Sequence, residues 1–133
     1  MKLRAPKPGW TAQADVVVIG SGVAGLTTAL QIRSHDLSVM LVTKSSVDEG
    51  STKWAQGGIA AALGPGDSPA QHERDTLVAG AGLCDLPAVK VLVSEGPEAV
   101  RKLIARGAVF DRSETGEIAL TREGGHLRNR ILH

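Results

Sequence analysis

Three glycines spaced as G-x-G-x-x-G, at Gly20, Gly22 and Gly25, are the first residues along the chain that could do binding chemistry. Such spacing allows a tight turn after a strand, a close approach of the backbone to a pyrophosphate, and tight packing of a following helix on the sheet. That helix would offer free N–H groups and its positive dipole end to the phosphates. We therefore predict a dinucleotide-binding turn; a turn kept only for packing is the alternative. The predicted cofactor contacts here are Gly20, Ser21, Gly22, Val23, Ala24 and Gly25.

The residues around this turn have the pattern of a strand, a helix and a second strand. Residues 16–19 are four consecutive β-branched residues, which favours a strand buried on both faces of a parallel sheet. Apolar residues recur at helical spacing from Val23 to Ser34 or His35, and the apolar run 37–43 has the length of a strand. A βαβ unit with parallel strands and a right-handed connection follows. The predicted fold class is α/β, Rossmann-like, with the start of a doubly wound parallel sheet that is incomplete.

The end of the second predicted strand bears on the type of dinucleotide. An Asp or Glu at this point usually binds the ribose hydroxyls, but Thr43 and Lys44 stand there instead. This departure weakens the hypothesis of an NAD-dependent dehydrogenase. Lys44 could contact a phosphate or ribose oxygen, or it could be a solvated charge at the end of the strand.

A second glycine-rich segment, residues 50–61, has the features of a surface for a planar ring. Paired glycines beside small residues let backbone amides lie flat against such a ring. Hydroxyls and an amide stand at the edge of the same segment, and a helix start without a ligand is the alternative. The predicted contacts are Ser51, Thr52, Lys53, Trp54, Ala55, Gln56, Gly57 and Gly58.

The pattern S-T-x-x-A-Q-G-G-I-A-A in this segment resembles the FAD-binding segment of the succinate dehydrogenase, fumarate reductase and L-aspartate oxidase flavoproteins. The resemblance extends from Asp15 to His133. It implies that the segment packs against the isoalloxazine ring of FAD and that Lys44 contacts FAD. The respiratory members carry a histidine that bonds covalently to the flavin where this chain has Ser51, so the resemblance implies non-covalent FAD.

The segment L-T-R-E-G-G-H, residues 120–126, indicates a branch of this family. The respiratory members resemble it with an aromatic residue in place of Glu123, whereas L-aspartate oxidases have the glutamate. Aspartate is succinate plus an α-ammonium group, and a carboxylate is the group that pairs with an ammonium. The resemblance thus implies that Glu123 recognises the substrate ammonium; taken alone, it reads as an exposed carboxylate in a glycine-rich loop. His126 either lines this site or only forms a hydrogen bond within the loop.

The activity implied by the resemblance is FAD-dependent oxidation of L-aspartate to iminoaspartate, with oxygen or fumarate as acceptor. This reaction would be the first step of quinolinate and NAD biosynthesis, with quinolinate synthase as an expected partner. The alternatives are a succinate dehydrogenase or fumarate reductase flavoprotein subunit and a non-catalytic dinucleotide-binding module. Because most dicarboxylate-binding residues of the family lie in later segments, we expect the chain alone to bind FAD poorly and to be inactive.

Composition limits the other function classes. The 133 residues carry a formal net charge of +1, so there is no electrostatic reason to expect nucleic acid or an anionic membrane as partner. No apolar run approaches the roughly 20 residues that span a bilayer. Cys84 is the single cysteine, which excludes an internal disulfide and favours a reducing compartment, the cytoplasm. We predict that Cys84 is a small buried apolar residue and that no metal is bound.

We predict the domain organisation as a flexible leader, residues 1–13, followed by residues 14–133 as the N-terminal part of an FAD-binding domain. The truncation would fall before the substrate-capping and C-terminal helical domains. Residues 131–133 would end the chain without a closing element. Three histidines, His35, His72 and His133, receive no role. Three arginines could steer dicarboxylates or simply lie on the surface: Arg122, Arg128 and Arg130.

Two helices and a hairpin are expected between residues 68 and 120. Ser68 and Asp85 are predicted to cap the helices, with Pro69 at the first helical position of the first one. The second helix should be interrupted and restarted at Gly96-Pro97 and should stop at Gly107. The predicted strand, turn and returning partner are residues 108–110, 111–116 and 117–120.

Overall fold

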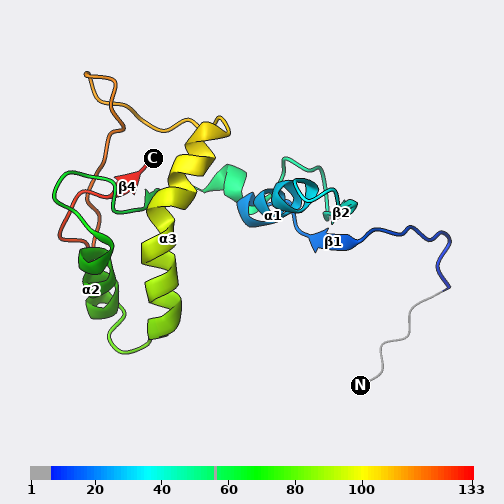
Figure 1. Ribbon diagram of the computed structural model, residues 1–133, viewed down its shortest axis with the longest axis horizontal. Helices are drawn as coiled ribbons and strands as arrows, with labels where there is room; N and C mark the ends of the chain where they lie inside the picture. The colour runs from blue at the N-terminus through cyan, green and yellow to red at the C-terminus, as the bar shows by residue number, and fades with distance from the viewer. Residues whose placement is uncertain (1–6, 56) are drawn as a thin grey trace. The chain divides into compact units, whose positions relative to one another are not determined.

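The computed structural model describes residues 7–55 and 57–133, and it divides the chain into two compact units, Met1–Ala55 and Gln56–His133 (Figure 1). The predicted leader lies partly outside the described residues, as does the predicted cofactor contact Gln56. Within the described part, residues 7–14 form no helix or strand. No helix built from the described residues combines the length and apolar character needed to cross a membrane.

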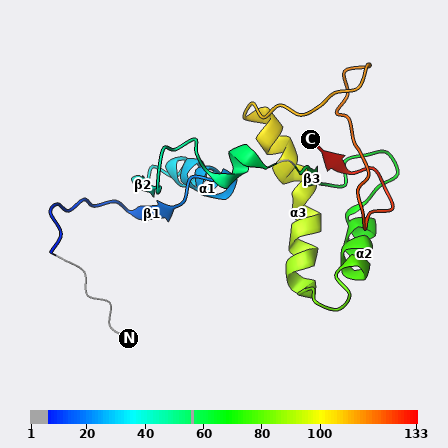
Figure 2. The same cartoon turned by 180° about the vertical axis from the view of Figure 1, so that it is seen from behind.

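The first unit contains the predicted βαβ arrangement. Strand β1 (Val16–Ile19) leads into helix α1 (Val23–Arg33), and strand β2 (Val39–Val42) returns beside β1 (Figures 1 and 2). The two strands are parallel, with Val16 opposite Val39 and Ile19 opposite Val42. The prediction of a partial Rossmann-like α/β fold is confirmed.

The prediction that residues 16–19 are buried on both faces is wrong for this unit. Val18 is buried, whereas Val17 is 53% exposed and Ile19 is 84% exposed. Within this unit β1 has one neighbouring strand, so β-branched side chains on its other face have nothing to pack against. The apolar run therefore predicted the strand correctly but not its burial.

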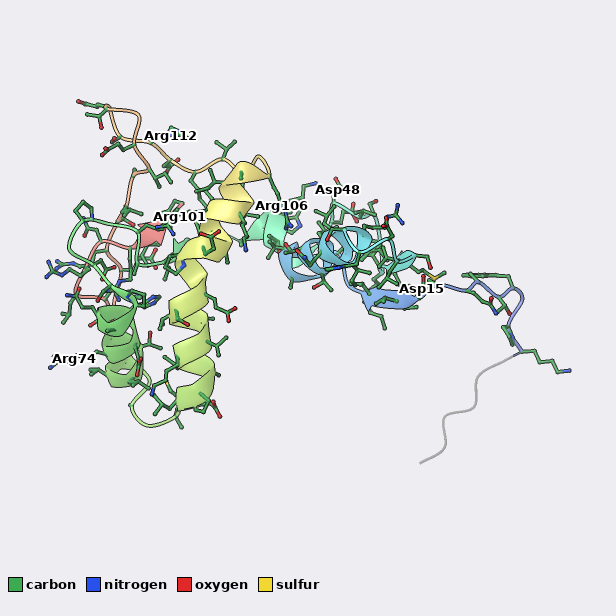
Figure 3. The ribbon with its side chains drawn as sticks, viewed as in Figure 1. Asp15, Asp48, Arg74, Arg101, Arg106 and Arg112 are labelled. Atoms are coloured by element: carbon green, nitrogen blue, oxygen red, sulfur yellow. The ribbon has the colours of Figure 1, made fainter. Side chains whose placement is uncertain are left out.

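A side chain at the start of β1 joins the two strands. Asp15 Oδ2 accepts hydrogen bonds from the backbone N–H of Ser38, at 2.8 Å, and from the Ser38 hydroxyl (Asp15 is labelled in Figure 3). Asp15 N in turn donates to Ser38 Oγ over 2.9 Å. These hydrogen bonds lower the pKa of the Asp15 carboxyl.

The second unit is built around two packed helices, α2 (Pro69–Ala79) and α3 (Leu86–Ala105) (Figures 1 and 2). Both predicted caps are confirmed: Ser68 Oγ accepts from Gln71 N at 3.3 Å, and Asp85 Oδ1 accepts from Ala88 N at 2.9 Å. Each cap satisfies one backbone donor that the helix leaves free. The signals for these helix starts are local, so the sequence could show them.

The predicted interruption at Gly96-Pro97 is wrong, because α3 runs without a break through both residues. Pro97 lacks an N–H, and an interior proline costs about 3 kcal/mol relative to alanine. It is nevertheless buried, on the same stripe as Val89, Val93 and Val100. Continuous apolar packing along this stripe offsets the lost hydrogen bond.

A two-stranded antiparallel sheet closes the second unit. Strand β3 (Ile59–Ala60) pairs with β4 (Ile131–Leu132), a strand that the sequence analysis did not predict. The partner strand lies far back in the sequence, and no local pattern could indicate this pairing. The core of the unit lies on this sheet and α3, and its residues are Ala61, Val100 and Leu132 with Leu63, Ile104, Phe110, Ile118 and Leu120 packed around them.

The predicted hairpin is only partly formed. The turn is present, with Ser113 N donating to Glu117 O and Ala119 N donating to Asp111 O, each over 2.8 Å. The expected strand at residues 108–110 is absent from the described structure, and Asp111 N instead donates to the His133 carbonyl over 2.8 Å. The prediction that Cys84 is buried is wrong: it is half-buried, and its Sγ donates to the Thr76 carbonyl over 3.6 Å.

The side chain of Arg130 lies in the interior of the second unit, where it contacts the loop before α2 and α2 itself. Its side chain is fully buried, and it donates to both carboxylate oxygens of Asp67, over 2.9 Å and 2.8 Å. Arg130 Nη1 also lies 2.9 Å from Asp75 Oδ2, which accepts a further bond from Leu127 N at 2.9 Å. The prediction of Arg130 as a surface residue or a steering charge is wrong, because its side chain is fully buried between carboxylates. The sequence could not indicate this, since neither carboxylate partner is adjacent in sequence.

Replacing Arg130 with leucine should strongly destabilise the second unit. The change leaves Asp67 and Asp75 buried without their partner, which costs about 3–5 kcal/mol in free energy of unfolding. Arg130→Lys should fall between wild type and Arg130→Leu, because lysine keeps the charge but not the two-pronged geometry. Urea unfolding of the chain followed by circular dichroism measures the difference.

The matched control is Arg128→Leu, at an exposed position two residues away. A surface change of this kind should alter stability by no more than about 0.5 kcal/mol. Equal urea midpoints for Arg130→Leu and Arg128→Leu would show that the buried charge network contributes little.

Candidate functional site

The glycine turn of the first unit has the geometry of a phosphate cradle. Gly20 has a φ of 106°, a backbone conformation that favours glycine. A Cβ at Gly25 would collide with the Gly20 carbonyl group, so α1 packs directly on the turn. Gly22 precedes α1 as its N-cap and provides no side-chain cap. The backbone N–H groups at the start of the helix are therefore not covered by a capping side chain of Gly22.

The backbone N–H groups at this helix start are only partly satisfied. Val23 N donates to Thr52 Oγ1 over 3.1 Å. For Ala24 N and Gly25 N, the described residues offer no acceptor. Free donors at a helix N-terminus bind anions, because the helix dipole adds to their positive charge. These two amides are the donors best placed for a pyrophosphate.

The start of the second glycine-rich segment packs against this turn. The 3-10 helix η1 (Ser51–Trp54) begins after Gly50, where a Cβ would lie 3.0 Å from the Ser21 carbonyl oxygen and 3.1 Å from Gly22 N. The structure thus brings Thr52 and the glycine turn together although they are far apart in sequence. Ser51 and Ala55, the other predicted contacts here, are exposed.

The end of β2 lies next to the same turn. Ser21 is buried, and its Oγ is 3.0 Å from Thr43 Oγ1. Lys44 follows Thr43 and is exposed, so its charge is available to a ligand. Lys53 has a local partner instead: its Nζ lies 3.4 Å from Asp48 Oδ2 (labelled in Figure 3) and 5.7 Å from the centre of the exposed Trp54 ring.

In the second unit, Gly58 packs directly on strand β4. A Cβ at this position would collide with Ile131 and with the Leu132 carbonyl oxygen, and it would lie 3.1 Å from His133 Cε1. Gly57 has open space around it. The paired glycines therefore differ, because Gly58 is required by the sheet and only Gly57 leaves room on its exposed side.

Glu123 lies beside a histidine that the sequence analysis left without a role. Its Oε1 is 3.4 Å from His133 Nε2, and the same nitrogen is 3.0 Å from Thr121 Oγ1. The Glu123 side chain is half exposed, so its carboxylate remains accessible. No pattern in the sequence could have indicated His133, because it reaches Glu123 only through the pairing of β4.

His126 belongs to the interior network. Its Nδ1 lies 3.5 Å from Arg130 Nη1, and its ring centre is 5.5 Å from that of His72. A guanidinium only donates, so His126 Nδ1 is the acceptor in this contact. The structure thus brings His126 together with Arg130 and His72, and the half-buried ring supports the loop that contains Glu123.

Burial and charge alter two acidities in this network. The backbone N–H of Leu127, together with the nearby Arg130 guanidinium, lowers the pKa of the Asp75 carboxyl. Burial lowers the pKa of His72, and the positive charge of Arg130 acts in the same direction. His72 Nδ1 is buried and finds no hydrogen-bond partner among the described residues. Both groups therefore favour one protonation state: Asp75 charged and His72 neutral.

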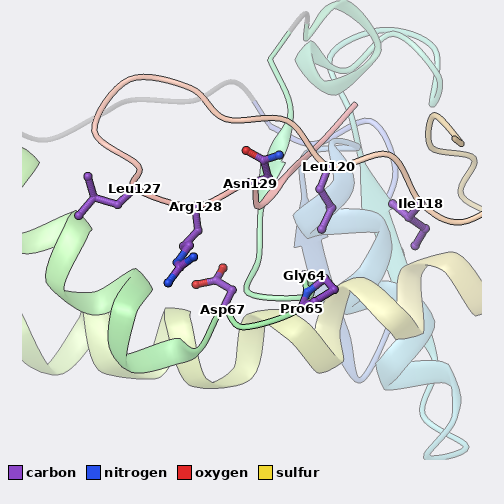
Figure 4. Close-up of a pocket in the computed structure, with 8 residues that line it drawn as sticks. All are labelled: Gly64, Pro65, Asp67, Ile118, Leu120, Leu127, Arg128 and Asn129. Carbon is purple, nitrogen blue, oxygen red and sulfur yellow. The ribbon is translucent and has the colours of Figure 1, made fainter.

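A hollow of about 490 Å³ is lined in part by the loop formed by residues 127–129. Asp67 and Arg128 are among the residues that line it, and Figure 4 shows their side chains pointing toward one another. Asp67 is already bound to Arg130, so Arg128 is the charged group in the lining that is available to a ligand. The sequence analysis did not predict this hollow, whose lining is Gly64, Pro65, Asp67, Ile118, Leu120, Leu127, Arg128 and Asn129.

Residues 15–133 match the model of a protein family described as "FAD binding domain". The chain is 65% identical over its whole length to an L-aspartate oxidase of Streptomyces coelicolor, of which it covers 23%. It is 53% identical over 123 residues to a chloroplastic L-aspartate oxidase of Oryza sativa subsp. japonica, covering 92% of this chain and 19% of that protein. The chain thus spans about a fifth of the length of these relatives.

Solved structures show the same fold. The chain resembles one from the Mycobacterium smegmatis Sdh1 complex in the apo form, with a TM-score of 0.85 and 38% sequence identity. The match covers 90% of this chain and 21% of that one.

The second unit should lose stability as the pH falls below neutrality. His72 has a lowered pKa, so the unfolded chain binds its proton first and stability is lost below the ordinary value of about 6.5, by at most about 1.4 kcal/mol per pH unit. Asp75, also lowered, stabilises the fold above its ordinary value and loses this contribution only in stronger acid. His72→Gln should therefore flatten the change in urea midpoint between pH 7 and pH 5.

The control is His35→Gln, at an exposed histidine of the first unit. This variant should keep the wild-type pH dependence. If His72→Gln retains the full wild-type loss of stability between pH 7 and pH 5, then His72 is not the group responsible.

Proposed function

The chain belongs to this family of FAD-binding domains, and on that premise we propose that it is the N-terminal part of an FAD-dependent L-aspartate oxidase. The 65% identity to the Streptomyces coelicolor enzyme over the whole chain supports the proposal. The observation that carries the substrate assignment is the accessible carboxylate of Glu123, placed beside strand β4. Residues 14–133 would then be followed by the substrate-capping and C-terminal helical domains.

FAD is the cofactor of the family, and the first unit fits its pyrophosphate. Ala24 N and Gly25 N would donate to the phosphate oxygens, and Gly22 would add no side chain of its own to the approach. Lys44 would add a positive charge, and Ser51 and Thr52 would contribute hydroxyls. Ser51 offers no imidazole for a covalent link, so we propose that the cofactor is held non-covalently. When bound, FAD supplies the electron-accepting chemistry that no side chain can provide.

Glu123 would recognise the α-ammonium group of L-aspartate. A carboxylate is an acceptor only, and its hydrogen bonds to a charged donor are stronger than those between neutral groups. Succinate lacks the ammonium group and would leave this interaction unmade. Glu123 would thus hold the substrate in one orientation and would select it over an unsubstituted dicarboxylate.

The product of the proposed reaction is iminoaspartate, with oxygen or fumarate as the final acceptor. Iminoaspartate would feed quinolinate formation and NAD biosynthesis, with quinolinate synthase as a partner. A cytoplasmic location agrees with the single cysteine, Cys84.

A second candidate is the flavoprotein subunit of a succinate dehydrogenase or fumarate reductase. The TM-score of 0.85 against the Mycobacterium smegmatis Sdh1 complex favours it as far as the fold is concerned. Its 38% identity is lower than the 65% to the L-aspartate oxidase of Streptomyces coelicolor, and Glu123 lacks an obvious use with succinate. We therefore rank it second.

Anaerobic mixing of the full-length enzyme with substrate tests the proposal. We expect L-aspartate to bleach the flavin absorbance and succinate only to compete. Glu123→Gln should raise the KM for L-aspartate by about 10- to 100-fold, as expected for loss of a hydrogen bond to a charged group. Its affinity for succinate should change little. Bleaching by succinate but not by L-aspartate would establish the second candidate instead.

Gly25→Ala should weaken FAD binding to the full-length enzyme by at least about tenfold, or about 1.4 kcal/mol. The added Cβ would push α1 away from Gly20 and so displace the phosphate-binding amides. Gly96→Ala is the matched control, because that glycine is also helical but its Cβ would meet open space. Flavin fluorescence titration measures both. FAD binding reduced equally in the two variants would count against the cradle.

A further inference from the structure

We propose that His133 is a positioning residue for Glu123 and thereby determines the preference for a substrate with an α-ammonium group. The inference rests on the proposed function, since it assumes that Glu123 binds that group. It concerns a residue that would not itself touch the substrate ammonium.

The contact geometry shows how His133 would act. Its Nε2 lies 3.4 Å from Glu123 Oε1 and 3.0 Å from Thr121 Oγ1. A carboxylate can only accept, so an interaction with Glu123 requires the proton on Nε2, and the same N–H then also faces the Thr121 hydroxyl oxygen. One carboxylate oxygen is thereby held by His133, and the other, Oε2, is left for the substrate.

Glu123 needs such a partner because its own backbone gives it little support. Gly124 and Gly125 follow it directly, and Gly125 has a φ of 82°. A side chain in a glycine-rich loop has many accessible positions, and ordering it costs conformational entropy. A contact from a rigid element would confine the carboxylate before the substrate binds, and so raise its affinity for the ammonium.

His133, in contrast, is held firmly. It follows β4, whose residues Ile131 and Leu132 are buried and paired with β3. Its carbonyl accepts from Asp111 N over 2.8 Å, and Gly58 packs close to its ring. Thr121, the other partner of Nε2, is itself paired with Ile131 through a backbone bond of 2.9 Å. Because the imidazole is fixed relative to the sheet, its contact with Glu123 fixes the carboxylate relative to the sheet as well.

The chemistry of imidazole suits this role better than that of other donors. A lysine or arginine beside Glu123 would be charged and would compete with the substrate ammonium. Imidazole can donate one N–H while it stays neutral, so the carboxylate keeps its charge. With the imidazole in its neutral form, the pair combines a fixed orientation with an uncompensated negative charge.

The test compares His133→Leu with His133→Gln in the full-length holoenzyme. Leucine removes the donor, whereas glutamine carries an N–H at nearly the same distance from the backbone. His133→Leu should raise the KM for L-aspartate by about tenfold, the order expected for a hydrogen bond to a charged group, with a smaller effect on kcat. His133→Gln should stay within about threefold of wild type. The Kd of succinate, read from the flavin absorbance change without turnover, should be unchanged in both variants.

Three results would overturn the inference. The first is equal weakening of L-aspartate and succinate in His133→Leu, which would indicate a merely structural role. The second is a KM for His133→Gln as high as that for His133→Leu. The third is additivity: if His133 acts through Glu123, adding His133→Leu to Glu123→Gln should raise the KM no further.

Failure of the proposed function would be visible separately in the wild-type enzyme. If succinate but not L-aspartate reduces the wild-type flavin, both the function and this inference are wrong. If L-aspartate reduces it and any of the three results above is obtained, only the inference about His133 is wrong.

Discussion

Arg130 can be buried only when Asp67 and Asp75 are both in place, and the second unit depends on this condition. Each of the three charges would be costly to remove from water alone, and together they compensate one another through short hydrogen bonds. Asp67 comes from the loop before α2, Asp75 from α2 itself, and Arg130 directly precedes β4. Closing the network therefore orders these segments together rather than one at a time.

The same network supports the loop of the proposed substrate site. Asp75 accepts a hydrogen bond from the Leu127 amide, and Arg130 contacts His126. The loop from Thr121 to Arg130 is therefore fixed at its C-terminal end. Glu123 remains accessible near the start of this loop. Alternation along β4 turns Arg130 toward the buried charges and places His133 on the same side as Ile131, near Gly58. One short strand thus serves both the interior of the unit and its proposed site.

The first unit uses a different physical principle. Its proposed ligand-binding groups are backbone amides at the start of α1, next to glycines that carry no side chain. Thr52 satisfies one of these amides and leaves the next two free. Such a site recognises the negative charge of a phosphate through backbone amides, whereas the second unit presents a side-chain carboxylate. The two kinds of recognition suit a cofactor and a charged substrate respectively.

The sequence by itself determined the features that depend on neighbouring residues. The βαβ order, the glycine turn and the caps at Ser68 and Asp85 all follow from local patterns, because a turn or a cap is formed within a few residues. The roles of Arg130 and His133, and the pairing of β3 with β4, were decided only by the tertiary structure. The unbroken course of α3 through Pro97 also depended on packing with distant residues. In each of these cases the stabilising partner lies outside the local segment, so its contribution to the free energy has no signature in a single sequence.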